Sequence, residues 1–294
     1  MDHFQHRDGA LFVENVAVDA IADAVGTPAY LYSRATLERH AQVFREGLSG
    51  VADKHIAFAV KANPNLAVLR VLARAGYGAD VVSGGEMARA VAAGMAPGDI
   101  VFSGVGKTRN ELVQGLETGI GQFNLELEEE GHVLAALAAQ RGLTAPATLR
   151  VNPDVDAGTH AKISTGKAEN KFGVAIDDAP GIFARLAGRP GINLRGLAVH
   201  IGSQLADLAP LERAYVRVGE MVRELRAAGH VITHVDLGGG LGVPYRPGEV
   251  MPTPAAFGAM VAHVTAGWDV TLMFEPGRVI AGNAGVLLTR VIWV

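Results

Sequence analysis

The 294-residue sequence contains no cysteine, so it can form neither a disulfide nor a metal site built on thiolates. No uninterrupted apolar run approaches the roughly 18 residues that span a bilayer, and residues 1–8 lack the apolar segment of a signal peptide. Charged residues make up only 19% of the chain, and the net charge of −4 gives no electrostatic case for nucleic acid or an anionic membrane as a partner. We therefore predict a soluble, cytoplasmic protein with no metal site.

Apolar residues are abundant, at 49%, and 37 glycines separate short apolar runs. Eight such runs alternate with helix-like segments, a pattern typical of parallel strands that are buried on both faces. The chain length suits a (β/α)₈ TIM barrel, which needs typically about 250 residues. An open doubly wound sheet is the main alternative, but no Gly-x-Gly-x-x-Gly turn follows the first strand. The expected barrel strands are residues 56–60, 80–82, 100–102, 122–125, 147–151, 197–199, 231–237 and 271–274.

Both ends of the sequence differ from this repeat. Residues 7–9 (Arg-Asp-Gly) predict a hairpin turn before a strand at 11–13, and residues 29–32 predict a further short strand. Residues 286–294 form an apolar strand on which the sequence stops, and we interpret this as a truncated chain. The expected α/β fold is thus a barrel with parts of an incomplete β-domain at both termini. The expected parts are N-terminal strands of the β-domain (1–28), the barrel (29–278) and the start of a C-terminal β-domain (279–294).

Polar residues follow the predicted strands, at the end of a barrel where catalytic groups lie. Lys61 directly follows the first strand. It is either a surface lysine or a desolvated amine whose lowered pKa makes it a Schiff-base nucleophile. His200 ends the sixth strand, although a lone histidine at a strand end is also common in a protein core. Ser203 follows it and offers a hydroxyl that could bind an anion.

The last two strands lead into a glycine cluster and an acidic segment. The amides of Gly238, Gly239 and Gly240 can form an anion-binding nest, although a flexible turn explains a glycine cluster equally well. Glu275 is costly to bury unless a basic group meets it, and Arg278 can clamp a phosphate or a carboxylate. The alternative is a structural pair between these two residues. Together the strand ends suggest a ligand with an aldehyde, a phosphate and a basic ring, as in pyridoxal phosphate. A barrel that binds no cofactor would require these residues to occur at all four strand ends by chance.

Several segments, read as a set, are specific to one enzyme family. They are residues 60–63, 78–86, 102–108, 152–155, 171–173, 200–204, 238–240 and 275–278. The set resembles the bacterial diaminopimelate decarboxylases, which belong to the alanine-racemase-like, fold type III pyridoxal enzymes. Members of that family continue into a β-domain that completes the substrate site and supplies a cysteine as proton donor. The sequence as given has neither.

The resemblance implies a role for each candidate residue. Lys61 would hold the cofactor as a Schiff base, His200 would stack on its ring, and Glu275 would pair with the ring nitrogen; these three are the predicted catalytic residues. Arg278 would also meet the substrate carboxylate, and Arg150 would support the ring hydroxyl. The predicted cofactor-binding residues are Lys61, His200, Ser203, Gly239, Gly240, Glu275, Pro276, Gly277 and Arg278.

The implied reaction is the decarboxylation of meso-2,6-diaminopimelate to L-lysine and carbon dioxide, the last step of lysine biosynthesis. The resemblance also implies a homodimer. Two alternatives stay open. One is another fold type III decarboxylase that acts on ornithine, arginine or a polyamine precursor, and the other is a non-catalytic protein that binds pyridoxal phosphate.

Overall fold

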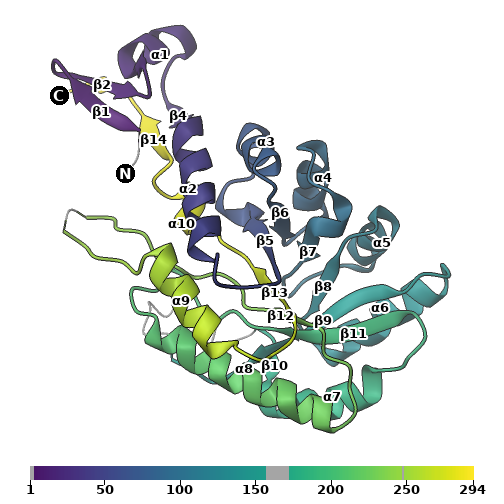
Figure 1. The fold of residues 1–294 in the computed structure, drawn as a ribbon. Helices are drawn as coiled ribbons and strands as arrows, with labels where there is room; N and C mark the ends of the chain where they lie inside the picture. Colours follow the sequence, from purple (N-terminus) through teal and green to yellow (C-terminus); the bar gives the residue numbers. More distant parts are fainter. Residues whose placement is uncertain (1–2, 157–171, 247) are drawn as a thin grey trace.

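The computed structural model describes residues 3–156, 172–246 and 248–294. Its centre is a closed barrel of eight parallel strands (Figure 1). Going round the ring, the strands are β5 (Lys54–Ala59), β6 (Gly78–Val81), β7 (Ile100–Phe102), β8 (Gln122–Leu125), β9 (Ala145–Asn152), β11 (Ile192–Ala198), β12 (His234–Asp236) and β13 (Thr271–Phe274). Pairing of β8 with β9 and of β13 with β5 closes the ring. The predicted TIM barrel is confirmed, and the open sheet is excluded.

Helices surround the barrel on its outside (Figure 1). Those that follow barrel strands are α3 (Leu66–Arg74), α4 (Gly84–Ala92), α5 (Arg109–Thr118), α6 (Glu128–Ala139), α7 (Ala179–Leu186), α8 (Ala209–Ala227), α9 (Pro254–Val264) and the short α10 (Arg278–Ala281). Three 3₁₀ turns, η1 (Val60–Ala62), η2 (Pro97–Asp99) and η3 (Ile176–Asp178), and the two-residue strand β10 (Val174–Ala175) beside β9 complete the barrel. Within the described ranges, no helix is long and apolar enough to cross a membrane.

One outer helix, α2 (Arg34–Gly47), precedes the first barrel strand, and the sequence analysis did not predict it. It packs between α9 and α3 and so fills the gap that the short α10 leaves in the ring of helices. The Ser33 side chain caps its N-terminus by accepting a hydrogen bond from the Thr36 backbone, and Leu37, Ala41 and Phe44 face the core. The cap and this spacing were the signals in the sequence.

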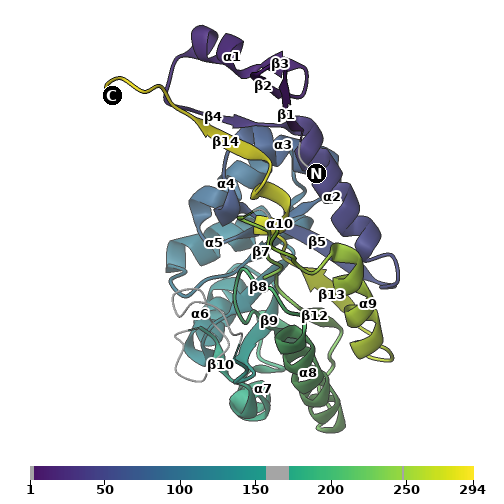
Figure 2. The ribbon, with the colours of Figure 1, turned by 90° about the vertical axis from the view of Figure 1, so that its left-hand side faces the viewer.

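Two small sheets lie outside the barrel, near both chain ends (Figure 2). One is the meander of β1 (Phe4–Arg7), β2 (Ala10–Val13) and β3 (Val16–Ala17), followed by α1 (Val18–Val25). The hairpin predicted at residues 7–9 is confirmed, because β1 and β2 pair across Asp8 and Gly9, which both have positive φ.

The second small sheet pairs β4 (Ala29–Tyr32) with β14 (Gly285–Leu288) in antiparallel fashion. The sequence analysis began the barrel at residue 29, but β4 makes no pairing with a barrel strand, and the first barrel strand is β5. It also expected a strand through residue 294, whereas β14 ends at Leu288, where its pairing with Ala29 ends. The division into three parts otherwise stays a prediction.

The barrel strands carry different side chains on their two faces, because successive residues of a strand point to opposite sides. Side chains such as Phe102, Phe123 and Leu149 belong to the apolar core shared with the helices. The inward positions of the same sheet carry polar groups that are buried and bonded across the interior, Gln122, Asn124, Thr148 and Asp236 among them. The barrel therefore has a polar interior beneath its carboxyl end.

Candidate active site

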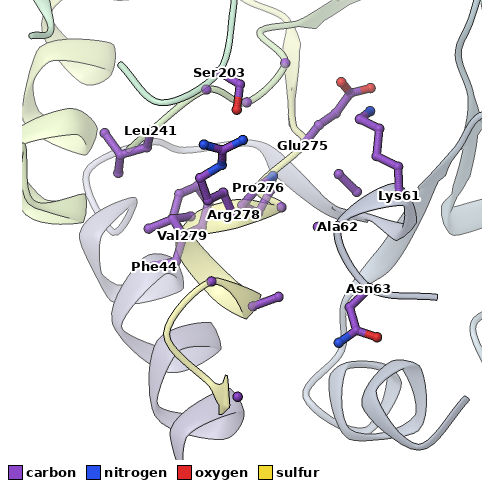
Figure 3. Close-up of a pocket in the computed structure, with 18 of the residues that line it drawn as sticks. Phe44, Lys61, Ala62, Asn63, Ser203, Leu241, Glu275, Pro276, Arg278 and Val279 are labelled. Atoms are coloured by element: carbon purple, nitrogen blue, oxygen red, sulfur yellow. The ribbon is translucent and has the colours of Figure 1, made fainter. Parts of the chain in front are cut away.

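The structure brings all nine predicted cofactor-binding residues to the lining of one cavity of about 580 Å³, where the barrel strands end. They come from four separate segments: η1 after β5, the loops after β11 and β12, and the loop after β13 together with the first residue of α10. Figure 3 shows the Lys61 and Glu275 side chains pointing toward each other, with Ser203 and Arg278 on the other side of the cavity. A neighbouring cavity of about 360 Å³ shares Lys61 and Glu275 and reaches into the polar interior.

Lys61 makes an ion pair with Asp80, a fully buried carboxylate on β6. Its Nζ lies 2.6 Å from Asp80 Oδ2, while 48% of the Lys61 side chain stays open to the cavity. Burial lowers the pKa of Lys61, but attraction to Asp80 and Glu275 outweighs burial, so the pKa is raised. The expectation of a lowered pKa is therefore wrong for the protein without cofactor, because the sequence did not reveal the two carboxylates around the amine.

Glu275 is 8% exposed and lies at the end of β13, above the polar interior. Its Oε1 is 3.4 Å from both the Ser103 hydroxyl and the Asn124 amide nitrogen. Burial and the negative charges of Asp236 and Asp80 raise the pKa of Glu275 well above its ordinary value. In the described structure Glu275 contacts Ser103 and Asn124 while Arg278 contacts Gln204, so the alternative of a structural pair between Glu275 and Arg278 is not supported.

His200 is held as a neutral ring. The Gly239 backbone N–H donates to its Nδ1 at 3.3 Å, so the ring proton belongs on Nε2. Burial and the nearby positive charges of Arg150 and Lys61 lower the pKa of His200 well below 6.5. The residue therefore lines the cavity as an uncharged ring across the physiological pH range.

Backbone closes the other end of the cavity. A Cβ on Gly239 would lie 2.2 Å from the Glu275 carbonyl oxygen, and one on Gly240, whose φ is +120°, would lie 2.6 Å from that of Gly202. A Cβ on Gly277 would come within 3.0 Å of the Ala59 Cβ. Side chains do not fit at these positions, so a ligand there meets peptide groups directly.

Arg278 brings a positive charge to the same end of the cavity. Its Nη1 lies 3.4 Å from Gln204 Oε1, and its guanidinium lies 5.8 Å from the centre of the Tyr245 ring. The Gln204 amide also bonds the Val243 backbone twice, donating to its oxygen at 2.6 Å and accepting from its nitrogen at 3.2 Å. Gln204 thus joins the loops after β11 and β12 to Arg278.

Arg150 lines the smaller cavity and is fixed by a buried partner that the sequence analysis missed. Its Nη1 lies 2.8 Å from Glu126 Oε1, and its guanidinium covers the Phe172 ring at 4.9 Å. Glu126 Oε2 accepts the Gly173 N–H at 2.8 Å. Of the predicted segment 171–173, Lys171 lies outside the described residues.

These residues fit pyridoxal phosphate on the evidence of their own geometry. On one side of the cavity, the Lys61 amine lies beside Asp80, a buried acid whose Oδ1 has no hydrogen-bond partner. Glu275, the acid above the polar interior, lies within the electrostatic reach of that amine. The other side offers peptide groups, a hydroxyl and Arg278, as a phosphate requires.

Comparisons with known proteins agree with this chemistry. Residues 34–282 match the pyridoxal binding domain of the pyridoxal-dependent decarboxylases. Diaminopimelate decarboxylase of Pseudomonas fluorescens is 51% identical over 292 residues, which are 99% of this chain and 70% of that protein. The Vibrio cholerae enzyme is 47% identical with the same coverage.

Solved structures give the same result. Diaminopimelate decarboxylase from Helicobacter pylori, complexed with L-lysine, superposes with a TM-score of 0.90 at 36% identity, covering 94% of this chain and 69% of that one. The M. jannaschii enzyme, also with L-lysine, gives 0.91 at 34% identity, covering 97% and 69%. A lysine decarboxylase from Selenomonas ruminantium, at 23% identity, shares the fold. The chain belongs to the pyridoxal-dependent decarboxylases and, within them, to the diaminopimelate decarboxylase family.

Proposed function

We propose that this chain decarboxylates meso-2,6-diaminopimelate to L-lysine and carbon dioxide, with pyridoxal phosphate held at Lys61. The observation that carries the proposal is the cavity in which the Lys61 amine and the Glu275 carboxyl face each other while glycine backbone closes the opposite end (Figure 3). The identity of 51% to a diaminopimelate decarboxylase over 99% of the chain supports the choice of substrate.

When bound, pyridoxal phosphate supplies an electron sink for the electron pair that remains when a carboxylate leaves as carbon dioxide. Lys61 would hold the cofactor through its amine, which the ion pair with Asp80 Oδ2, 2.6 Å from Nζ, keeps in place at the cavity wall. Glu275, whose pKa is raised, would pair with the ring nitrogen and share a proton with it. His200, neutral and fixed by Gly239, supports the ring face.

The remaining residues hold the charged groups. Ser203, Gly239, Gly240 and Gly277 would bind the phosphate with a hydroxyl and backbone amides, alongside Pro276 at the cavity wall. Arg278 would bind either the phosphate or the substrate carboxylate, because its guanidinium can contact both oxygens of such a group at once. Arg150 would support the ring hydroxyl from the smaller cavity.

The test is product analysis of the purified chain with pyridoxal phosphate and a panel of amino acids. We expect L-lysine and carbon dioxide from meso-diaminopimelate, and no product from L-lysine, L-ornithine or L-arginine. Lys61→Ala should abolish both the product and the cofactor adduct trapped by borohydride. Glu275→Ala should keep the trapped adduct but lose the product. A different preferred amino acid, or turnover by Glu275→Ala, would contradict the proposal.

Assembly, location and domain division belong to the same proposal. We expect a homodimer in the cytoplasm, with residues 1–28 and 279–294 contributing to a β-domain next to the barrel. The support is the family, together with the small sheet of β1–β3 and the strand β14, which make no pairing with a barrel strand. Sedimentation velocity of the purified protein tests the dimer, and a monomer at micromolar concentration would count against it.

A further inference from the structure

A second carboxylate, Asp236, lies buried below Glu275, and the proposed function gives it no role. It sits at the end of β12 and is 1% exposed. Its Oδ1 accepts the Gly238 N–H at 2.9 Å, and its Oδ2 accepts the Asn124 amide at 2.9 Å and the Gln122 amide at 3.4 Å. Asp236 also lines the smaller cavity, which Lys61 and Glu275 share.

Asn124 joins the two carboxylates. Its Nδ2 donates to Asp236 Oδ2 at 2.9 Å and lies 3.4 Å from Glu275 Oε1. The Asn124 amide cannot flip without losing hydrogen bonds, because its Oδ1 accepts one from the Thr148 hydroxyl at 2.5 Å and one from the Gln122 amide at 2.9 Å. A fixed amide thus holds Asp236 beside Glu275 inside the barrel.

The two cations near this pair are both engaged by other acids. Lys61 is already paired with Asp80, while Arg150 is paired with Glu126, and the hydrogen-bonded neighbours Ser103 and Asn124 are neutral. Burial, followed by the charges of Asp236 and Asp80, raises the pKa of Glu275. The titratable and charged groups that face it are Lys61 from η1, Asp80 from β6, Arg150 from β9, His200 after β11 and Asp236 from β12.

We propose that Asp236 is a positioning residue for Glu275: held beside it by Asn124, its negative charge keeps on Glu275 the proton that Glu275 would share with the ring nitrogen of pyridoxal phosphate. The inference rests on the proposed role of Glu275. Two acids that share one buried site do not both ionise easily, so one proton stays between them as the pH rises.

The test measures the titration of Glu275 in the protein without cofactor. The infrared C=O stretch of its protonated carboxyl is followed against pH and assigned by its disappearance in Glu275→Gln. Asp236→Asn removes the neighbouring charge, so we expect the midpoint to fall by about one pH unit or more. Asp99→Asn, which removes an acid in η2 outside both cavities, is the control and should leave the midpoint in place.

Asn124→Ala provides an independent arm, because it removes the bridging amide and keeps both acids. The contact between Asn124 and Glu275 is the longer one, at 3.4 Å, so the main effect is that Asp236 is no longer held beside Glu275, and we expect the midpoint to fall by less than in Asp236→Asn. A fall in both variants is the expected result. An unchanged midpoint in Asp236→Asn overturns the proposal, and if that variant does not fold, an unchanged or raised midpoint in Asn124→Ala does so.

With cofactor bound, we also expect Asp236→Asn to change the pH profile of turnover. The alkaline limb of kcat should shift to lower pH in Asp236→Asn by a similar amount, a change that a purely structural role would not produce. If the wild-type chain binds no pyridoxal phosphate, the proposed function fails, but the titration without cofactor still decides whether Asp236 controls the proton on Glu275.

Discussion

An amine that attacks an aldehyde must first be neutral, yet Asp80 holds Lys61 as an ammonium at 2.6 Å. The pair places Nζ at the cavity wall and fixes its direction, while the raised pKa slows the loss of its proton at neutral pH. Loss of the Lys61 proton also gives up this ion pair with a fully buried carboxylate. Capture of the cofactor should therefore depend on this one carboxylate.

We expect Asp80→Asn to capture pyridoxal phosphate faster than the parent chain at about pH 8. Removing the carboxylate lowers the pKa of Lys61, and a fall of one pH unit gives about ten times more neutral amine. The measurement is the rate at which a borohydride-trappable adduct forms. Asp99→Asn, in η2 before β7 and outside both cavities, is the control. A slower or unchanged rate in Asp80→Asn would contradict this account of the ion pair.

Lys61 and Glu275 could be identified from the sequence because each follows an apolar run that a barrel buries, so the end of the run points to the site. Asp236 and Asn124 could not be identified in this way. Their partners lie 112 and 151 residues away along the chain, and the predicted strands, residues 122–125 and 231–237, continue past both of them. The closure of the barrel determines whether a polar residue of a strand points inward. It also determines which residues of other strands that side chain contacts.

At the scale of elements, all eight barrel strands were predicted, three of them with the observed bounds: β7, β8 and β13. Parallel strands buried on both faces leave near-continuous apolar runs, a strong signal. The loops were harder to predict, because their conformation depends on close contacts between backbone segments that are distant in the sequence. The loop after β12 needs Gly240 at φ +120° against the Gly202 carbonyl oxygen, a contact between two segments distant in sequence.

We expect Gly240→Ala to weaken the binding of pyridoxal phosphate by about tenfold or more, corresponding to about 1.4 kcal/mol. The new Cβ would lie 2.6 Å from the Gly202 oxygen and must displace the loop that closes the cavity. Gly229→Ala is a matched control, since Gly229 also has positive φ (+90°) but its Cβ would meet no atom within 4 Å. Both variants carry backbone strain, so equal affinities in the two would refute a phosphate site at this loop.

At the scale of the whole molecule, the site exists only because the barrel closes. Four segments supply its rim, and β6, β8 and β12 supply the acids and the amide beneath it. The alternation of strands and helices made this closure predictable. The pairing of β4 with β14 was not, because short strands near opposite ends of the chain contain no information about each other.

Buried groups with shifted pKa values should give the protein without cofactor a stability optimum near neutral pH. Burial lowers the pKa of His234 from 6.5 to about 4, so below pH 6.5 the unfolded chain binds a proton that the folded chain does not, and the free energy of unfolding falls. The pKa of Glu275 is raised above 4.5, so its contribution is complete below that pH and is lost as the pH rises toward the folded value.

We therefore expect His234→Gln to reduce the acid decline and Glu275→Gln to reduce the alkaline one. For the partly exposed His234, the difference between about pH 6.5 and pH 5 should be about 1 kcal/mol after allowance for solvent screening. Urea unfolding of the parent chain and both variants at about pH 5, 6.5 and 8.5 measures these differences. Each substitution removes one titrating group, so each should change the stability on one side of the optimum only. If His234→Gln also removed the alkaline decline, the assignment of the two declines to separate groups would be wrong.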